Sequence, residues 1–186
     1  MNRTDLPVWL LDVDGVINAF PTIRQPGSWR RNQWTRFKVR GFHIQAARPV
    51  LDFIRKVHEE GLAEIRWHTT WQEKALDLGD VLGLPTFHIA AAPEFDDRPD
   101  NVPHLGYWWK AAAAYRVVDV EKRRLLWTDD DATELDDYDN RRIWAGGPGT
   151  AMVIAPDPSD GLVQTDLDRI QLFLTNNLAT KEVSLP

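Results

Sequence analysis

The chain lacks cysteine altogether, which excludes disulfide bonds and metal sites built on thiolates. It also lacks any apolar run of the roughly 18 residues that a membrane-spanning helix needs. Only Met1 to Asp5 precede the first predicted strand, so we expect no signal peptide. With 43% hydrophobic and 27% charged residues in a chain of 186, these features favour one globular domain, residues 1–186, in the cytosol and away from membranes.

Acidic residues are missing from residues 15–51, although the chain as a whole has a net charge of −6. The same stretch holds seven of the chain's 22 lysines and arginines: Arg24, Arg30, Arg31, Arg36, Lys38, Arg40 and Arg48. Basic charge gathered in one segment of an acidic protein indicates a local anion site. It argues against a general affinity for polyanions.

Within this stretch, residues 34–44 alternate aromatic or aliphatic side chains with basic ones, which is the period-two pattern of an exposed hairpin. We expect a small β-hairpin flap over about residues 19–45. Cations interleaved with flat rings can bind phosphates and stack on bases, as in single-stranded nucleic-acid binding. The candidate substrate-binding residues here are Arg30, Trp34, Arg36 and Lys38. The alternative is an amphipathic hairpin whose basic face is only solvated.

The residues that follow the first predicted strand carry the main chemical signal. An apolar run from Val8 to Leu11 stops at Asp12 and Asp14, and Gly15 lets the chain turn away. Two carboxylates that face one small volume repel each other, so they need a hard cation or a proton on one of them. Such a pair suits phosphoryl transfer, with one carboxylate as nucleophile and its neighbour as proton shuttle. The plain alternative is a strand followed by an Asp-Gly turn.

A second apolar run, from Arg124 to Thr128, ends in the same way at Asp129, Asp130 and Asp131. Two strands that end in carboxylates predict a cluster of hard oxygen ligands. Such a cluster suits Mg²⁺, and it does not suit zinc without histidine or cysteine. The pattern leaves open which of the three aspartates bind the metal.

Two further positions fall where a phosphate can be held. A predicted strand over residues 62–71 ends in Thr69 and Thr70, either of which can donate to a phosphoryl oxygen or cap the next helix. Lys110 lies in the first turns of a predicted helix, where a cation is unfavourable against the helix dipole unless an anion lies close by. A solvated lysine is the alternative.

The remaining elements are read from periodicity and from glycine and proline breaks. Helices are predicted over residues 46–61, 72–82, 108–117 and 166–174, strands over 86–90 and 151–155, a loop over 93–103, and a frayed tail over 176–186. The strand that ends at Leu11 and the strand over residues 62–71 are expected to pair in a βαβ unit, which brings their carboxyl ends together.

Taken in order, the four strand and helix ends resemble the motifs of the haloacid-dehalogenase-like phosphohydrolase superfamily. The matching residues are Leu11-Asp12-Val13-Asp14-Gly15, the strand that ends in Thr69, Lys110 at a helix start, and Leu126-Trp127-Thr128-Asp129-Asp130. The resemblance covers roughly residues 7–175. It implies an α/β fold with a doubly wound, mainly parallel sheet whose site lies at the carboxyl edge of the strands.

The same resemblance implies a role for each matching residue. Asp12 is expected to be the nucleophile that forms an aspartyl-phosphate, and Asp14 the acid that protonates the leaving oxygen and then activates water. Thr69 and Lys110 are expected to hold the phosphoryl group, with Thr70 as the alternative hydroxyl. Mg²⁺ is expected to bind Asp12, Asp129 and the backbone carbonyl of Asp14, with Asp130 as an outer or additional ligand.

The flap and one helix fill the space between the first two motifs, and residues 72–110 are too few for a large cap domain. Capless members of the superfamily often act on large substrates, and the chain is similar to phosphatase-like domains proposed for RNA repair systems. We therefore expect an enzyme, a Mg²⁺-dependent phosphatase acting on polynucleotide ends or nucleotides. Two alternatives stay open: a small-metabolite phosphatase acting on sugar phosphates, and a binding or regulatory module on an inactive phosphatase scaffold.

Overall fold

The computed structural model describes residues 6–21, 28–90, 108–134, 143, 146–147 and 149–182. Its centre is a five-stranded parallel sheet in the order β5-β4-β1-β6-β7. The strands are β1 (Val8–Leu11), β4 (Glu64–Trp67), β5 (His88–Ile89), β6 (Leu125–Thr128) and β7 (Ala151–Ile154). The middle strand β1 is buried along its whole length, which is why its sequence is apolar without alternation.

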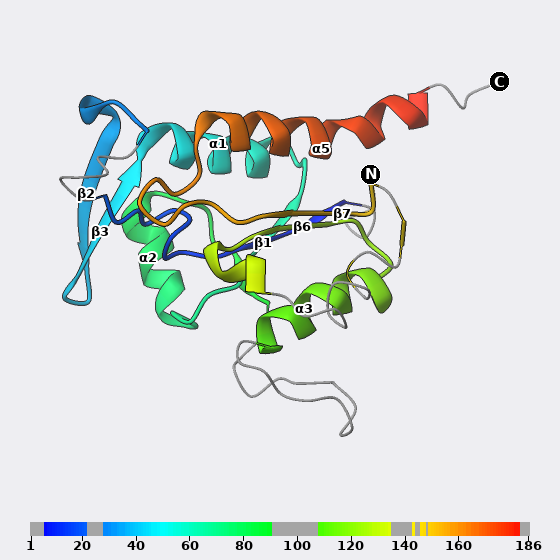
Figure 1. Ribbon diagram of the computed structural model, residues 1–186, viewed down its shortest axis with the longest axis horizontal. Coiled ribbons are helices and arrows are strands. Elements are labelled where there is room, and N and C mark those ends of the chain that lie inside the picture. Colours follow the sequence, from blue (N-terminus) through cyan, green and yellow to red (C-terminus); the bar gives the residue numbers. More distant parts are fainter. Residues whose placement is uncertain are drawn as a thin grey trace.

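Helices cover both faces of this sheet, as Figure 1 shows. The helices α1 (Arg48–Glu59) and α5 (Gln164–Glu182) lie along one face, and α3 (Trp108–Asp119) lies along the other. The side chains of β1 alternate between two apolar cores accordingly. Trp9 and Leu11 face the core shared with α1 and α5, whereas Val8 and Leu10 pack against the alanines of α3. The protein is therefore an α/β fold in which each face of the sheet has its own core.

A separate two-stranded antiparallel sheet forms a hairpin at one end of the molecule (Figure 1). Its strands are β2 (Trp34–Val39) and β3 (Phe42–Ala47), and the short 3-10 helix η2 (Arg31–Gln33) precedes them. Val39 and Ile44 are buried in the core, whereas Arg36 and Lys38 are exposed. This alternation confirms the predicted hairpin, although residues 22–27 of the predicted flap lie outside the described part of the chain.

The predicted elements are present, with shifted ends. Because β3 continues to Ala47, α1 begins at Arg48, two residues later than predicted. Pro49 is tolerated there, since the first turn of a helix leaves its N–H groups without intrahelical partners. The helix α2 (Lys74–Leu82) ends where predicted, at Leu82, and Gly83 follows as a left-handed C-cap with a φ of 65°.

The largest difference concerns the last helix. We predicted its end at Leu174 and a frayed tail after it, but α5 runs on to Glu182. The loop predicted over residues 93–103 lies outside the described residues, as do residues 183–186. Among the described helices, none is both long and apolar enough to cross a membrane.

Candidate active site

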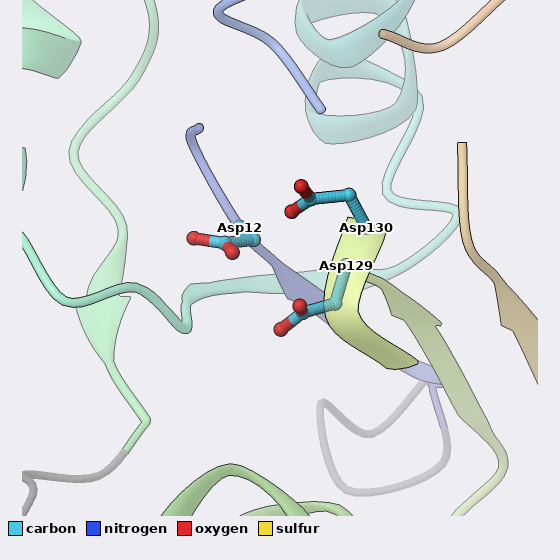
Figure 2. A group of neighbouring side chains, drawn as sticks. All are labelled: Asp12, Asp129 and Asp130. Atoms are coloured by element: carbon cyan, nitrogen blue, oxygen red, sulfur yellow. The ribbon is translucent and has the colours of Figure 1, made fainter. Parts of the chain in front are cut away.

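The predicted carboxylates meet at the edge of the sheet where β1 and β6 end. These strands pair in parallel with Leu11 opposite Thr128, so the residues that follow them emerge side by side. The N–H of Asp12 donates to the carbonyl of Thr128 at 3.1 Å, which extends the pairing by one residue. Asp12, Asp129 and Asp130 each offer a carboxylate oxygen within 4.8 Å of the others. Figure 2 shows the three side chains turned to the same side.

Gly15 allows the loop after β1 to pass close to Asp130. Its φ of 69° lies in the left-handed region, and a Cβ added there would lie 2.2 Å from the Cγ atom of Asp130. No side chain fits that space without displacing the carboxylate. The glycine of the Asp-Gly pair therefore does more than turn the chain, because it makes room for the third carboxylate.

Lys110 is buried against Asp12 and Asp129 and neutralises part of the charge of the cluster. Its Nζ atom lies 2.6 Å from Oδ2 of Asp12 and 2.7 Å from Oδ2 of Asp129. The other oxygens of these two residues accept backbone N–H groups, of Val13 at 2.7 Å and of Asp131 at 3.1 Å. Both carboxylates are thus held in one orientation by a cation on one side and a peptide N–H on the other.

One lysine does not balance three clustered carboxylates. Burial, with the nearby Asp129, raises the pKa of Asp12 to about 6 despite Lys110. Burial also raises the pKa of Asp129, and burial together with Asp131 and Asp12 raises the pKa of Asp130 to about 6. Burial alone would lower the pKa of Lys110, but Asp12 and Asp129 raise it above its ordinary value.

These values describe a site that favours a further cation. Carboxylate oxygens are the ligands that Mg²⁺ prefers, and three of them lie close enough to share one ion. The donor set of Asp12, Asp129 and Asp130 therefore fits Mg²⁺. Asp131 is exposed and outside this group, so the structure favours Asp129 and Asp130 among the three consecutive aspartates.

Asp14 is held apart from that group by two side chains. Its Oδ1 atom accepts a hydrogen bond from Nδ2 of Asn18 at 2.7 Å, and its Oδ2 atom accepts one from Nε1 of Trp71 at 2.8 Å. The carboxylate is only partly buried and lines a pocket that Asp12 does not line. The two aspartates of the first motif thus have different surroundings, as different chemical roles would require.

The two threonines after β4 also lie in different surroundings. Thr69 is buried, and its Oγ1 atom accepts the N–H of Trp71 at a long 3.4 Å. Thr70 is exposed and lines the pocket beside Asp14. Thr69 lies two residues beyond the end of β4, the strand that pairs with β1, and its role as a phosphoryl ligand stays a prediction.

His68 ties the end of β4 to the start of α3. Its Nε2 atom lies 2.9 Å from the backbone oxygen of Lys110. Burial, together with the charge of Lys110, lowers the pKa of His68 to about 3, so the ring is neutral at physiological pH. Because a carbonyl oxygen can only accept, Nε2 carries the proton. The histidine therefore helps to fix the turn of helix that carries Lys110.

A pocket of about 420 Å³ opens next to Asp14, between the hairpin and the loop that follows β4. Phe42 and Trp71 meet edge to face within it, with ring centroids 5.3 Å apart. Its lining residues are Asp14, Asn18, Phe20, Phe42, His43, Ile44, Thr70, Trp71 and Lys74.

The predicted flap residues are not part of that pocket lining. Arg30, Arg36 and Lys38 are exposed, and Nε of Arg36 donates to Oε1 of Gln45 at 3.1 Å. Trp34 is half-buried and donates its indole N–H to the carbonyl of Trp29 at 3.1 Å. The residues on β2 are set back because β3 lies nearer the site, where the N–H of Gln45 donates to Oδ1 of Asn18 at 2.9 Å.

Three residues of the pocket lining are not marked by any of the sequence motifs described above: Asn18, Phe20 and Trp71. Asn18 has a weak signal, since it closes the motif segment that begins at Asp12. Trp71 immediately follows the two threonines. Its indole N–H reaches the first motif because β4 pairs with β1, and this pairing cannot be read from the residues around Trp71. No protein-family model matches the chain, and no curated protein matches it either.

Proposed function

We propose that the protein is a Mg²⁺-dependent phosphatase that hydrolyses phosphate monoesters through an aspartyl-phosphate on Asp12. The observation that carries the proposal is the convergence of Asp12, Asp129 and Asp130, the first two of them paired with Lys110, with Asp14 fixed separately. One carboxylate that lies against a buried cation can act as a nucleophile, while a second, more exposed one can move protons. This division of roles is the one that two-step phosphate transfer needs.

The fold supports a finer assignment to the haloacid-dehalogenase-like type, with a doubly wound sheet and no large cap. The supporting features are the parallel sheet with helices on both faces and a site at the carboxyl edge of its central strands. In the described residues the accessory element beside the site is the hairpin of β2 and β3. An accessory element as small as this hairpin is compatible with a large substrate.

The proposed reaction has two steps. In the first, a carboxylate oxygen of Asp12 attacks phosphorus, the bond from phosphorus to the leaving oxygen breaks, and Asp14 gives its proton to that oxygen. In the second, Asp14 takes a proton from water, the water oxygen attacks phosphorus, and the bond to Asp12 breaks. Inorganic phosphate leaves, and both aspartates return to their starting states.

Lys110 and the metal have complementary roles in this scheme. Lys110 lies within hydrogen-bond distance of Asp12, where its charge can also attract the phosphoryl oxygens. Mg²⁺ held by Asp12, Asp129 and Asp130 would neutralise negative charge on the phosphoryl group and on the clustered carboxylates. Thr69 would donate its hydroxyl to a phosphoryl oxygen.

For the substrate, we propose a nucleotide or the phosphorylated end of a nucleic acid. The basic stretch supports this class, because the exposed Arg30, Arg36 and Lys38 belong to the segment that borders the site. One observation favours the alternative of a small sugar phosphate: none of these three residues lines the pocket beside Asp14. The two substrate classes can be separated by experiment.

The test is a panel of phosphate esters assayed for phosphate release with and without Mg²⁺. We expect turnover of 5′- or 3′-phosphorylated oligonucleotides and of mononucleotides, lost when the metal is chelated. Turnover of sugar phosphates with none of the nucleic-acid substrates would contradict the substrate assignment. Absence of turnover on every ester, with Mg²⁺ present and the protein folded, would contradict the phosphatase itself.

A double variant of the hairpin, Arg36→Gln with Lys38→Gln, refines this panel. The variant loses two positive charges that could contact the phosphates of a nucleic acid. The KM for oligonucleotides should therefore rise and depend less on salt concentration, with a smaller effect on the KM for mononucleotides. The small-metabolite alternative predicts that the rate barely changes on any substrate. Lys56→Gln is the matched control, since Lys56 is exposed on α1.

A further inference from the structure

The pocket beside Asp14 gathers exposed aromatic side chains. Phe20 and Phe42 are 50% and 56% exposed, and both face the pocket together with Trp71. One exposed phenyl ring would be unremarkable, but apolar side chains that gather in one hollow, as these three do, are typical of a binding site. The volume of about 420 Å³ lies within the range of roughly 300–1,000 Å³ that is usual for small-molecule sites.

The position of the pocket indicates which part of a substrate enters it. The pocket is lined by Asp14 and not by Asp12, Asp129 or Asp130. A general acid must lie within hydrogen-bond reach of the leaving oxygen, so the leaving group extends to the side of the acid. The phosphoryl group then lies over Asp12, and the rest of the substrate points toward the aromatic rings.

Few polar side chains line the pocket that could read one base against another: apart from Asp14 they are Asn18, His43, Thr70 and Lys74. The amide of Asn18 is engaged at both ends, since Nδ2 donates to Asp14 and Oδ1 accepts from the backbone of Gln45. Lys74, exposed at the start of α2, adds a positive charge to the lining. Flat aromatic walls with one cation suit a planar ring whose neighbouring groups are anionic, and they tolerate any base.

We propose that the pocket formed by Phe20, Phe42 and Trp71 holds the nucleobase of the leaving nucleoside, and that Trp71 also positions Asp14 for proton transfer. This proposal rests on the proposed phosphatase function, and it extends that function by naming the residues that select the leaving group. Lys74 would pair with the next phosphate of an oligonucleotide.

Trp71 links the two halves of this proposal. Its ring contacts Phe42 at 5.3 Å between centroids, and its N–H holds Oδ2 of Asp14. A base that stacks in the pocket restricts the indole, and the indole in turn fixes the carboxylate that meets the leaving oxygen. Trp71 is therefore a positioning residue as well as a wall of the pocket.

The experiment compares adenosine 5′-monophosphate with ribose 5-phosphate, which lacks only the base. Phe42→Ala should raise the KM for the nucleotide by about ten- to hundredfold, because stacking on one ring is lost. The ratio of kcat/KM for nucleotide over sugar phosphate should fall by the same factor. Val120→Ala, a change at a residue that is 64% exposed and outside the pocket lining, should leave this ratio unchanged.

Trp71→Phe tests the second half, because it keeps a ring and removes the N–H donor. We expect kcat for the nucleotide to fall about tenfold with little change in KM. The fall should be smaller with p-nitrophenyl phosphate, whose leaving group departs without a proton. An equal fall for both esters would assign Trp71 a merely structural role.

The outcomes separate this inference from the function on which it rests. If the wild-type protein hydrolyses both esters and Phe42→Ala leaves their ratio unchanged, the pocket does not hold the base, although the phosphatase assignment stands. If the wild type hydrolyses neither ester with Mg²⁺ present, the phosphatase assignment fails and the inference fails with it. A cooperative thermal transition in each variant confirms that it is folded.

Discussion

Replacing Asp12 with asparagine is expected to lower kcat for phosphate esters by about 10⁴-fold or more without unfolding the protein. The amide cannot attack phosphorus, yet it has the size of the carboxylate, and its oxygen can still accept the N–H of Val13. Lys110 keeps Asp129 as an ionic partner at 2.7 Å. The measurement is the initial rate of phosphate release, together with the thermal unfolding curve.

Asp168→Asn is the matched control for that variant. Asp168 is exposed on α5 and is not part of the acidic cluster. Its side chain accepts a hydrogen bond from Gln164. This control should keep full activity. An Asp12→Asn protein that retains more than a few per cent of the activity would remove Asp12 from the role of nucleophile. Unchanged ligand binding and biological effect in that variant would instead favour the regulatory-module alternative.

Removing the charge of Lys110 is expected to have the largest effect on stability. Lys110→Met leaves Asp12 and Asp129 buried without their ammonium partner, and losing one member of a buried ion pair costs about 3–5 kcal/mol. Turnover should be lost as well, since the phosphoryl group loses a positive neighbour. The free energy of unfolding should be measured by denaturant titration, with Lys56→Met as the control on α1.

The loss in Lys110→Met should depend on pH with a defined sign. Burial holds the pKa of Asp12 at about 6, above its ordinary value of 3.8, and removing Lys110 raises it further. A raised carboxyl pKa contributes stability that is present below about 3.8 and lost as pH rises through the folded-state value. The variant should therefore be closest to the wild type near pH 5 and furthest from it above pH 7.

Added Mg²⁺ should recover part of the stability lost in Lys110→Met, because it supplies a new cation to Asp12 and Asp129, which have lost their ammonium partner. The recovery should vanish when Asp129→Asn is added, since that change removes a ligand. A Lys110→Met protein as stable as the wild type at every pH would show that the buried charges do not need a cation.

Much of the fold could be predicted because its signals are local. The short all-apolar run of β1, closed by Asp and Gly, is typical of a buried strand, and the alternation in β2 favours a strand over a helix. Element ends were less predictable, since β3 and α1 join without a break and only Pro49 marks the first turn. The extension of α5 beyond Leu174 could not be predicted, because the residues after Leu174 show no strong helical periodicity of apolar side chains.

The acidic part of the site was also predictable, because parallel strands bring their carboxyl ends to one edge. The closeness of Asp12 and Asp129 follows directly from the pairing of Leu11 with Thr128, the residues that precede them. The pocket was not predictable in this way. The sequence favoured Trp34, Arg36 and Lys38 of β2 as substrate contacts, and these stay predictions. The pocket beside Asp14 is lined by Phe42 of β3 and by Trp71, which the sequence did not single out. Which hairpin strand faces a neighbouring loop depends on tertiary packing, and no local pattern encodes it.

The most direct test of the account is to trap the covalent intermediate in Asp14→Asn. With p-nitrophenyl phosphate the first step needs no acid, whereas the second step lacks the base that activates water, so the phosphoryl group should accumulate on the enzyme. After an acid quench, mass spectrometry should find it on Asp12, only with Mg²⁺ present, and not when Asp12→Asn is added. Release of p-nitrophenol with the phosphoryl group on another residue, or on none, would contradict the account.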